Sequence, residues 1–226
     1  MNKSILTFIF LTLFSLSAWA DDSIDVPAII SKNKCIDCHK LSPKDSGGPD
    51  KGPDLFFSGN KFKTEWLIEF LQKPETIRIA GHITNPGFLT GQPTGIEAHP
   101  ILSTKEGKAV AKYLMSLKLE GFESGKVDSF PLSKGQKVKA KILFERDYGC
   151  TACHKGINLA RKPKGGISGP SLVTAGDRLN PDWIFHWLKN PKTFIDRGRM
   201  PAFKFDDETT IQIVKYLMTL KKENLR

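Results

Sequence analysis

The sequence predicts an all-α fold built from two copies of one domain in tandem. No stretch of the chain alternates for long between apolar and polar residues, as a half-buried strand would. Matching residues also recur at one fixed displacement, which is typical of repeated domains. Near the end of each half, apolar residues recur at the spacing of an amphipathic helix, at Val110, Leu114 and Leu117 and again at Ile213, Leu217 and Leu220.

The first 20 residues have the pattern of a secretory signal peptide. Lys3 precedes an apolar run from Ile5 to Leu16, and Ala18 and Ala20 follow as the small residues of a cleavage site. The apolar run is shorter than the roughly 20 residues that span a bilayer. We therefore expect cleavage after Ala20 and export across the inner membrane to the periplasm. An uncleaved anchor and a lipid attachment are the alternatives.

Each copy is expected to contain three main helices. They fall at 24–34, 65–72 and 112–118 in the first copy (residues 21–118), and at 138–148, 182–189 and 215–221 in the second (residues 135–226). Residues 119–134 are rich in Gly, Ser, Lys and Glu, a composition typical of a linker. Each copy is small for a self-sufficient core, so we expect a bound apolar group at its centre.

Single residues make the repeat visible. One set of residues is matched 117 positions later by a second set: Gly52-Pro53-Asp54-Leu55, Gly59, Trp66 and Pro74, then Gly169-Pro170-Ser171-Leu172, Gly176, Trp183 and Pro191. Such matching at a single displacement indicates two copies of one domain.

All four cysteines lie in two C-x-x-C-H motifs, Cys35-Ile36-Asp37-Cys38-His39 and Cys150-Thr151-Ala152-Cys153-His154. This motif attaches haem c: both sulfurs bond to the cofactor and the histidine becomes an axial ligand of the iron. The sequence therefore predicts two covalently bound haem c groups. Three alternatives fit less well. Disulfides across two residues would be strained, 111 residues separate Cys38 from Cys150 in a shared zinc site, and a thioredoxin-like motif needs alternating strands and helices.

Together with the G-P-x-L segments and the Y-L-x-x-L ends of the terminal helices, these motifs resemble two class I cytochrome c domains in tandem. The resemblance covers nearly all of the mature sequence. It implies that each domain wraps around one covalently attached haem. It also implies that the carbonyls of Pro53 and Pro170 accept hydrogen bonds from His39 and His154, fixing each ring and its tautomer.

The second axial ligand differs between the copies. The segment Arg199-Met200-Pro201-Ala202-Phe203 resembles the family's distal methionine loop, so Met200 is the expected ligand of the second iron. In the first copy no methionine lies between Cys38 and Met115, and a His-Pro pair at His99 takes the corresponding place. We expect bis-histidine ligation by His39 and His99. His82, which lies 8 residues after Pro74, is the alternative ligand, and an open iron is another.

The charge is concentrated in the second half of the chain. Residues 21–118 carry 13 Lys and Arg against 12 Asp and Glu, whereas residues 119–226 carry 20 against 12. An exported chain without an aromatic-interleaved basic stripe is not expected to bind nucleic acid. Redox protein partners, acidic or membrane-associated, fit this charge better, with Arg161, Lys162 and Lys164 as candidate contacts; simple solubility is the alternative.

These observations favour an exported dihaem cytochrome that passes electrons between redox partners without catalysing bond chemistry. Methionine ligation should give the second haem the higher potential. The alternatives are a haem enzyme that binds a small substrate at an open or labile first iron, a sensor, and an electron-relay subunit of a larger oxidoreductase. Trp66 and Trp183 are either donors to haem propionates or core residues.

Overall fold

The computed structural model describes residues 24–45, 51–80, 98–195 and 198–226. The expected signal peptide and the alternative ligand His82 lie outside these ranges. Within them, no helix is long and apolar enough to cross a membrane.

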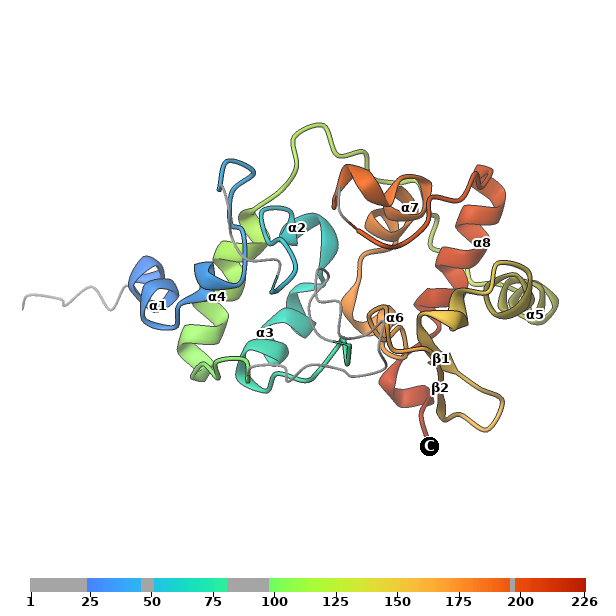
Figure 1. Ribbon diagram of the computed structural model, residues 1–226, viewed down its shortest axis with the longest axis horizontal. Helices are drawn as coiled ribbons and strands as arrows, with labels where there is room; N and C mark the ends of the chain where they lie inside the picture. Colours follow the sequence, from blue (N-terminus) through green and yellow to red (C-terminus); the bar gives the residue numbers. More distant parts are fainter. Residues whose placement is uncertain (1–23, 46–50, 81–97, 196–197) are drawn as a thin grey trace, which may run out of the picture.

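Helices of the two copies form two neighbouring halves of the molecule (Figure 1). The first half contains α1 (Val26–Lys32), α2 (Ser58–Lys61), α3 (Thr64–Gln72) and α4 (Thr104–Ser116). The second contains α5 (Lys134–Ile142), α6 (Ala175–Arg178), α7 (Pro181–Lys189) and α8 (Asp207–Met218), with one hairpin of β1 (Lys155–Ile157) and β2 (Pro163–Gly165). The chain is thus largely helical, as predicted.

Local sequence explains where the longer helices begin. Ser103 and Glu106 form a capping box at the start of α4, and Ser133 and Gln136 form the same motif at the start of α5. The Asp206 carboxylate accepts a hydrogen bond from the backbone of the first turn of α8. These caps satisfy amide groups that have no partner within their own helix.

Each half has a core of apolar side chains. In the first half, α1, α3 and α4 bury Ile29, Leu67, Leu71, Val110, Ala111 and Leu114 against one another. The core of the second half is larger, and it also contains Phe57 and Phe62 of the first copy. Phe57 is 1% exposed and lies against Trp183 and Phe194 of the second copy. The core of the second half therefore extends across the boundary and includes side chains of both copies.

Equivalent segments of the two copies pair with each other across this boundary. The amide of Lys63 donates to the carbonyl of Arg178 over 2.8 Å, and the amide of Asn180 donates to the carbonyl of Lys61 over 2.9 Å. Asn180 lies 117 residues after Lys63, and Arg178 lies 117 residues after Lys61. Each of the two hydrogen bonds is therefore the counterpart of the other in the repeat. The copies are thus related by a local pseudo-two-fold arrangement, like the same surface patch on both subunits of a symmetric dimer.

Two features could not be recognised from the sequence patterns. The loop after the second C-x-x-C-H motif folds into the β1–β2 hairpin, although its Gly- and Lys-rich sequence shows no strand alternation. The segment 119–134 is packed rather than free: Leu119, Phe122 and Val127 contact the second core, and Asp182 accepts hydrogen bonds from the amides of Gly125 and Val127. Flexible-linker composition therefore does not exclude fixed contacts.

Candidate haem sites

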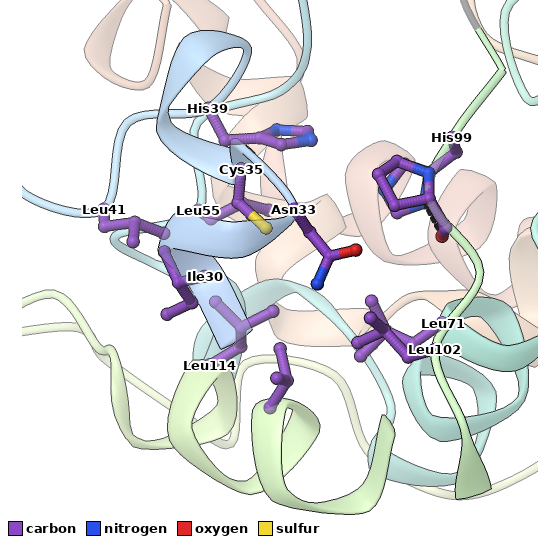
Figure 2. Close-up of a pocket in the computed structure, with 12 residues that line it drawn as sticks. Ile30, Asn33, Cys35, His39, Leu41, Leu55, Leu71, His99, Leu102 and Leu114 are labelled. Atoms are coloured by element: carbon purple, nitrogen blue, oxygen red, sulfur yellow. Dashed lines mark hydrogen bonds between the residues drawn. The ribbon is translucent and has the colours of Figure 1, made fainter. Parts of the chain in front are cut away.

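The first candidate site lies between the first C-x-x-C-H motif and the segment that enters α4. The rings of His39 and His99 face each other, with centroids 6.2 Å apart and planes inclined by 57°. Figure 2 shows His39 and Cys35 on one side of a pocket and His99 on the other. The rest of its lining is mainly apolar: Ile30, Asn33, Leu41, Leu55, Leu71, Pro100, Leu102, Val110 and Leu114.

Backbone carbonyls fix the tautomers of both histidines. His39 Nδ1 lies 2.7 Å from the carbonyl oxygen of Pro53, and His99 Nδ1 lies 2.9 Å from that of Pro100. A carbonyl oxygen can only accept, so each Nδ1 carries the hydrogen and each Nε2 carries a lone pair. A metal-binding histidine is usually held in this way.

The spacing of the two rings also suits a shared metal. Two metal–imidazole bonds of about 2.0 Å each, added to the distance from each ring centre to its nitrogen, come to about the observed centroid separation. Burial lowers the pKa of His39, and the nearby His99 and Lys61 lower it further. A lowered pKa keeps the imidazole neutral, as a ligand must be.

The second C-x-x-C-H motif repeats the arrangement on the cysteine side. His154 Nδ1 lies 2.8 Å from the carbonyl oxygen of Pro170. The glycine before each proline is required by the ring itself, because a Cβ on Gly52 or Gly169 would overlap the imidazole of His39 or His154. The G-P pair of the repeat thus leaves room for the histidine and orients it.

Residues at equivalent positions contact the expected sixth ligands. On α7, Trp187 Nε1 donates to Met200 Sδ over 2.9 Å. On α3, the residue 117 positions earlier is Phe70, and its ring packs edge-on against His99 with centroids 5.2 Å apart. Neither Trp187 nor Phe70 was predicted from the sequence to contact a ligand. The repeat offered a signal, because the displacement of 117 aligns the two positions.

None of the four cysteines forms a disulfide. Burial raises the pKa of Cys35, and it raises the pKa of Cys150 to about 11. Thiols of redox-active C-x-x-C motifs have lowered pKa values instead. Among the described residues, no group of three or more His, Cys, Asp or Glu could hold a metal ion by itself. The raised pKa values of these cysteines therefore do not match those of a redox-active dithiol.

Buried donors give a further test of whether haem fits the second site. Arg178 and Trp183 are 4% and 5% exposed, and neither Arg178 Nε nor Trp183 Nε1 has a hydrogen-bond partner within the described ranges. The charges of Arg78 and Arg178 add to the effect of burial in lowering the pKa of His154. Haem has two propionate carboxylates, and these could accept hydrogen bonds from the unpaired Arg178 Nε and Trp183 Nε1.

His186 has a different environment from the three histidines above. Its Nε2 lies 2.8 Å from the carbonyl oxygen of Glu123, so it holds the segment between the copies against α7. Met115 and Met218 both pack against the cores. At both C-x-x-C-H motifs, by contrast, a proline carbonyl orients the histidine that follows the two cysteines. This arrangement defines the class of protein as one that binds haem c.

Comparison with known proteins agrees with this class. Residues 25–118 match the family model described as cytochrome c, and residues 137–217 match the model described as cytochrome c oxidase, cbb3-type, subunit III. Searches of curated proteins and of solved structures found no match. The chain thus contains two cytochrome c-type domains in tandem. Such domains carry covalently bound haem c and transfer electrons through it.

Proposed function

We propose that this chain is an exported dihaem class I cytochrome c that carries electrons between redox partners. Its thioether-forming residues are Cys35, Cys38, Cys150 and Cys153. His39 and His99 are the axial ligands in the first domain, and His154 and Met200 are those in the second. The observation that carries the proposal is the facing pair His39 and His99, with each Nε2 available to a metal.

Two ligands on each iron favour a carrier over an enzyme. Haem in these domains supplies one-electron chemistry, and an iron with both axial positions filled has no place for a substrate. His99 would have to leave before a small molecule could bind at the first site. Its ring is held by Pro100 on one side and packs against Phe70 on the other, which favours retention.

The unlike ligands set a direction for electron flow. A thioether favours ferrous iron more than an imidazole does, so the Met200-ligated haem has the higher potential and receives electrons from the first. A potentiometric titration measures both potentials. A lower potential for the Met200-ligated haem would contradict this order.

The proposed partners are acidic or membrane-associated redox proteins that meet the chain in the periplasm. The β1–β2 hairpin presents Arg161, Lys162 and Lys164 as exposed cations beside the second C-x-x-C-H motif. Charges in such positions speed association with an acidic surface, and salt weakens the effect.

Low-temperature electron paramagnetic resonance of the fully oxidised, haem-loaded protein tests the ligand assignment. The wild type should show two low-spin signals. Replacing His99 with Ala should convert one of them to a high-spin signal. The matched control His186→Ala should leave both low-spin signals unchanged. A stoichiometric high-spin signal in the wild type would instead favour an enzyme that binds substrate at the first iron.

A relay subunit of a membrane oxidoreductase is the second candidate, favoured by the match of residues 137–217 to a cbb3-type oxidase subunit model. Fractionation separates the two candidates. A free carrier is released with the periplasmic fraction at low salt, whereas a relay subunit stays with the solubilised membrane complex.

A further inference from the structure

The second site is bounded on one side by a residue of the first copy. Arg78 follows α3, and its Nη2 donates to the carbonyl of Ser168 over 2.7 Å. Next to it, the carbonyl of Ile77 accepts a hydrogen bond of 2.7 Å from the amide of Ser171. These two bonds hold residues 77–78 of the first copy against the loop whose Pro170 orients His154.

The guanidinium of Arg78 is incompletely satisfied at this position. Its Nε is buried and has no hydrogen-bond partner among the described residues, like Nε of Arg178 and Nε1 of Trp183. Burial lowers the pKa of Arg78, and the nearby Arg199 lowers it further. A buried donor of a cation without an acceptor is costly, so the arrangement calls for an anion.

The charge of Arg78 is within reach of the second haem site. Its partner Ser168 lies two residues before Pro170, whose carbonyl oxygen is 2.8 Å from His154 Nδ1. The pseudo-two-fold relation provides no counterpart for the first haem, because the residue 117 positions after Arg78 is Ile195. At this position the first copy offers a cation to the second site, and Ile195 offers none in return.

We propose that Arg78 binds a propionate carboxylate of the haem carried by the second domain, so that the first domain completes the second haem site. This inference rests on the proposed function, which places a haem at His154. An arginine fork can offer two parallel N–H donors to a carboxylate. Because Nη2 already bonds to Ser168, Nε is the donor that the carboxylate would satisfy.

A neutralised propionate would raise the potential of the second haem. Ferric haem carries one more positive charge than ferrous haem, and a nearby cation disfavours the ferric form. Replacing Arg78 by Gln removes the cation and leaves the carboxylate uncompensated. Both changes lower the potential of the second haem, whereas the first haem keeps its potential.

The test uses the full-length, haem-loaded protein and three variants: Arg78→Gln, Arg78→Lys and, as a control, Lys108→Gln on the exposed side of α4 in the first copy. Mass spectrometry first establishes two haems per chain. Spectropotentiometry should then show that Arg78→Gln shifts the reduction equilibrium of the second haem about tenfold towards the ferric form, which is about 59 mV for one electron. Arg78→Lys should shift it by less than half as much, and Lys108→Gln should leave it unchanged.

Several outcomes would overturn the inference. An unchanged second potential in Arg78→Gln would do so, as would a shift confined to the first haem. Equal shifts in the Gln and Lys variants would mean that Arg78 acts only through its bond to Ser168. Resonance Raman of Arg78→Lys gives a second readout should the Gln variant fail to mature, because the propionate-bending band must shift. A wild type without two haems would instead refute the proposed function.

Discussion

The hydrogen bond from Trp187 to Met200 offers a sharp test of the second site. Replacing Trp187 with Phe removes the N–H donor that lies 2.9 Å from the sulfur and keeps an aromatic ring. That ring can preserve the packing on Trp183 and Phe194, whose centroids lie 5.1 Å and 5.9 Å away. The equivalent position in the first copy already holds a phenylalanine, Phe70, so the helix accepts this residue.

The size of the expected effect follows from the strength of the bond. A hydrogen bond typically contributes about 0.5–1.5 kcal/mol net. An N–H donor draws electron density from the thioether, which then stabilises ferric iron less. If the full contribution depends on the redox state, loss of the donor lowers the potential by roughly 20–65 mV, since a tenfold change is about 59 mV for one electron. The decrease in potential should therefore not exceed about 65 mV.

Potentiometry of the two haems, combined with the near-infrared band of methionine-ligated ferric haem, measures the effect. Trp187→Phe should lower the second potential and leave the band present. Trp66→Phe is the matched control, because it removes an indole N–H from the first copy and should leave the second potential unchanged. An unchanged or raised second potential in Trp187→Phe would refute the reasoning, and loss of the band would mean that Trp187 holds the methionine in place.

Three further predictions concern the two sites and their shared core. Gly169→Ala should block insertion of the second haem by displacing His154, whereas Gly135→Ala at the exposed start of α5 should have no effect; haem content by mass decides. Phe57→Ala should destabilise the protein by about 3–5 kcal/mol in denaturant titrations, because this side chain is 1% exposed in the core shared by both copies. Met200→His should lower the second potential towards that of the first haem and abolish the near-infrared band.

Much of this organisation could be predicted from the sequence because the relevant signals are local or repeated. The C-x-x-C-H motif carries its own chemistry, and the displacement of 117 residues shows the duplication. Amphipathic spacing predicted the C-terminal parts of α4 and α8. It did not show their beginnings, which depend on the caps at Ser103 and Asp206.

The remainder depends on contacts between distant residues. Arg78 belongs to no motif, and its partner Ser168 lies 90 residues further along the chain. The β1–β2 hairpin has strands of three residues each, too short for an alternating pattern to be recognised. The fixed course of residues 119–134 depends on Asp182 and on the second core, which composition does not reveal.

The pseudo-symmetry shows where the two copies differ in function. The backbone pairing at their boundary is reciprocal, so one scaffold holds both sites. Among the described residues, three differences between the copies lie next to the proposed haems. Met200 replaces a histidine, Trp187 replaces Phe70 as the neighbour of that ligand, and Arg78 has only Ile195 as its equivalent. In the proposed assignment, the thioether, its N–H donor and the added cation each favour the ferrous form of the second haem. Because all three act in the same direction, a potential difference can arise between two closely similar domains without any change in their fold.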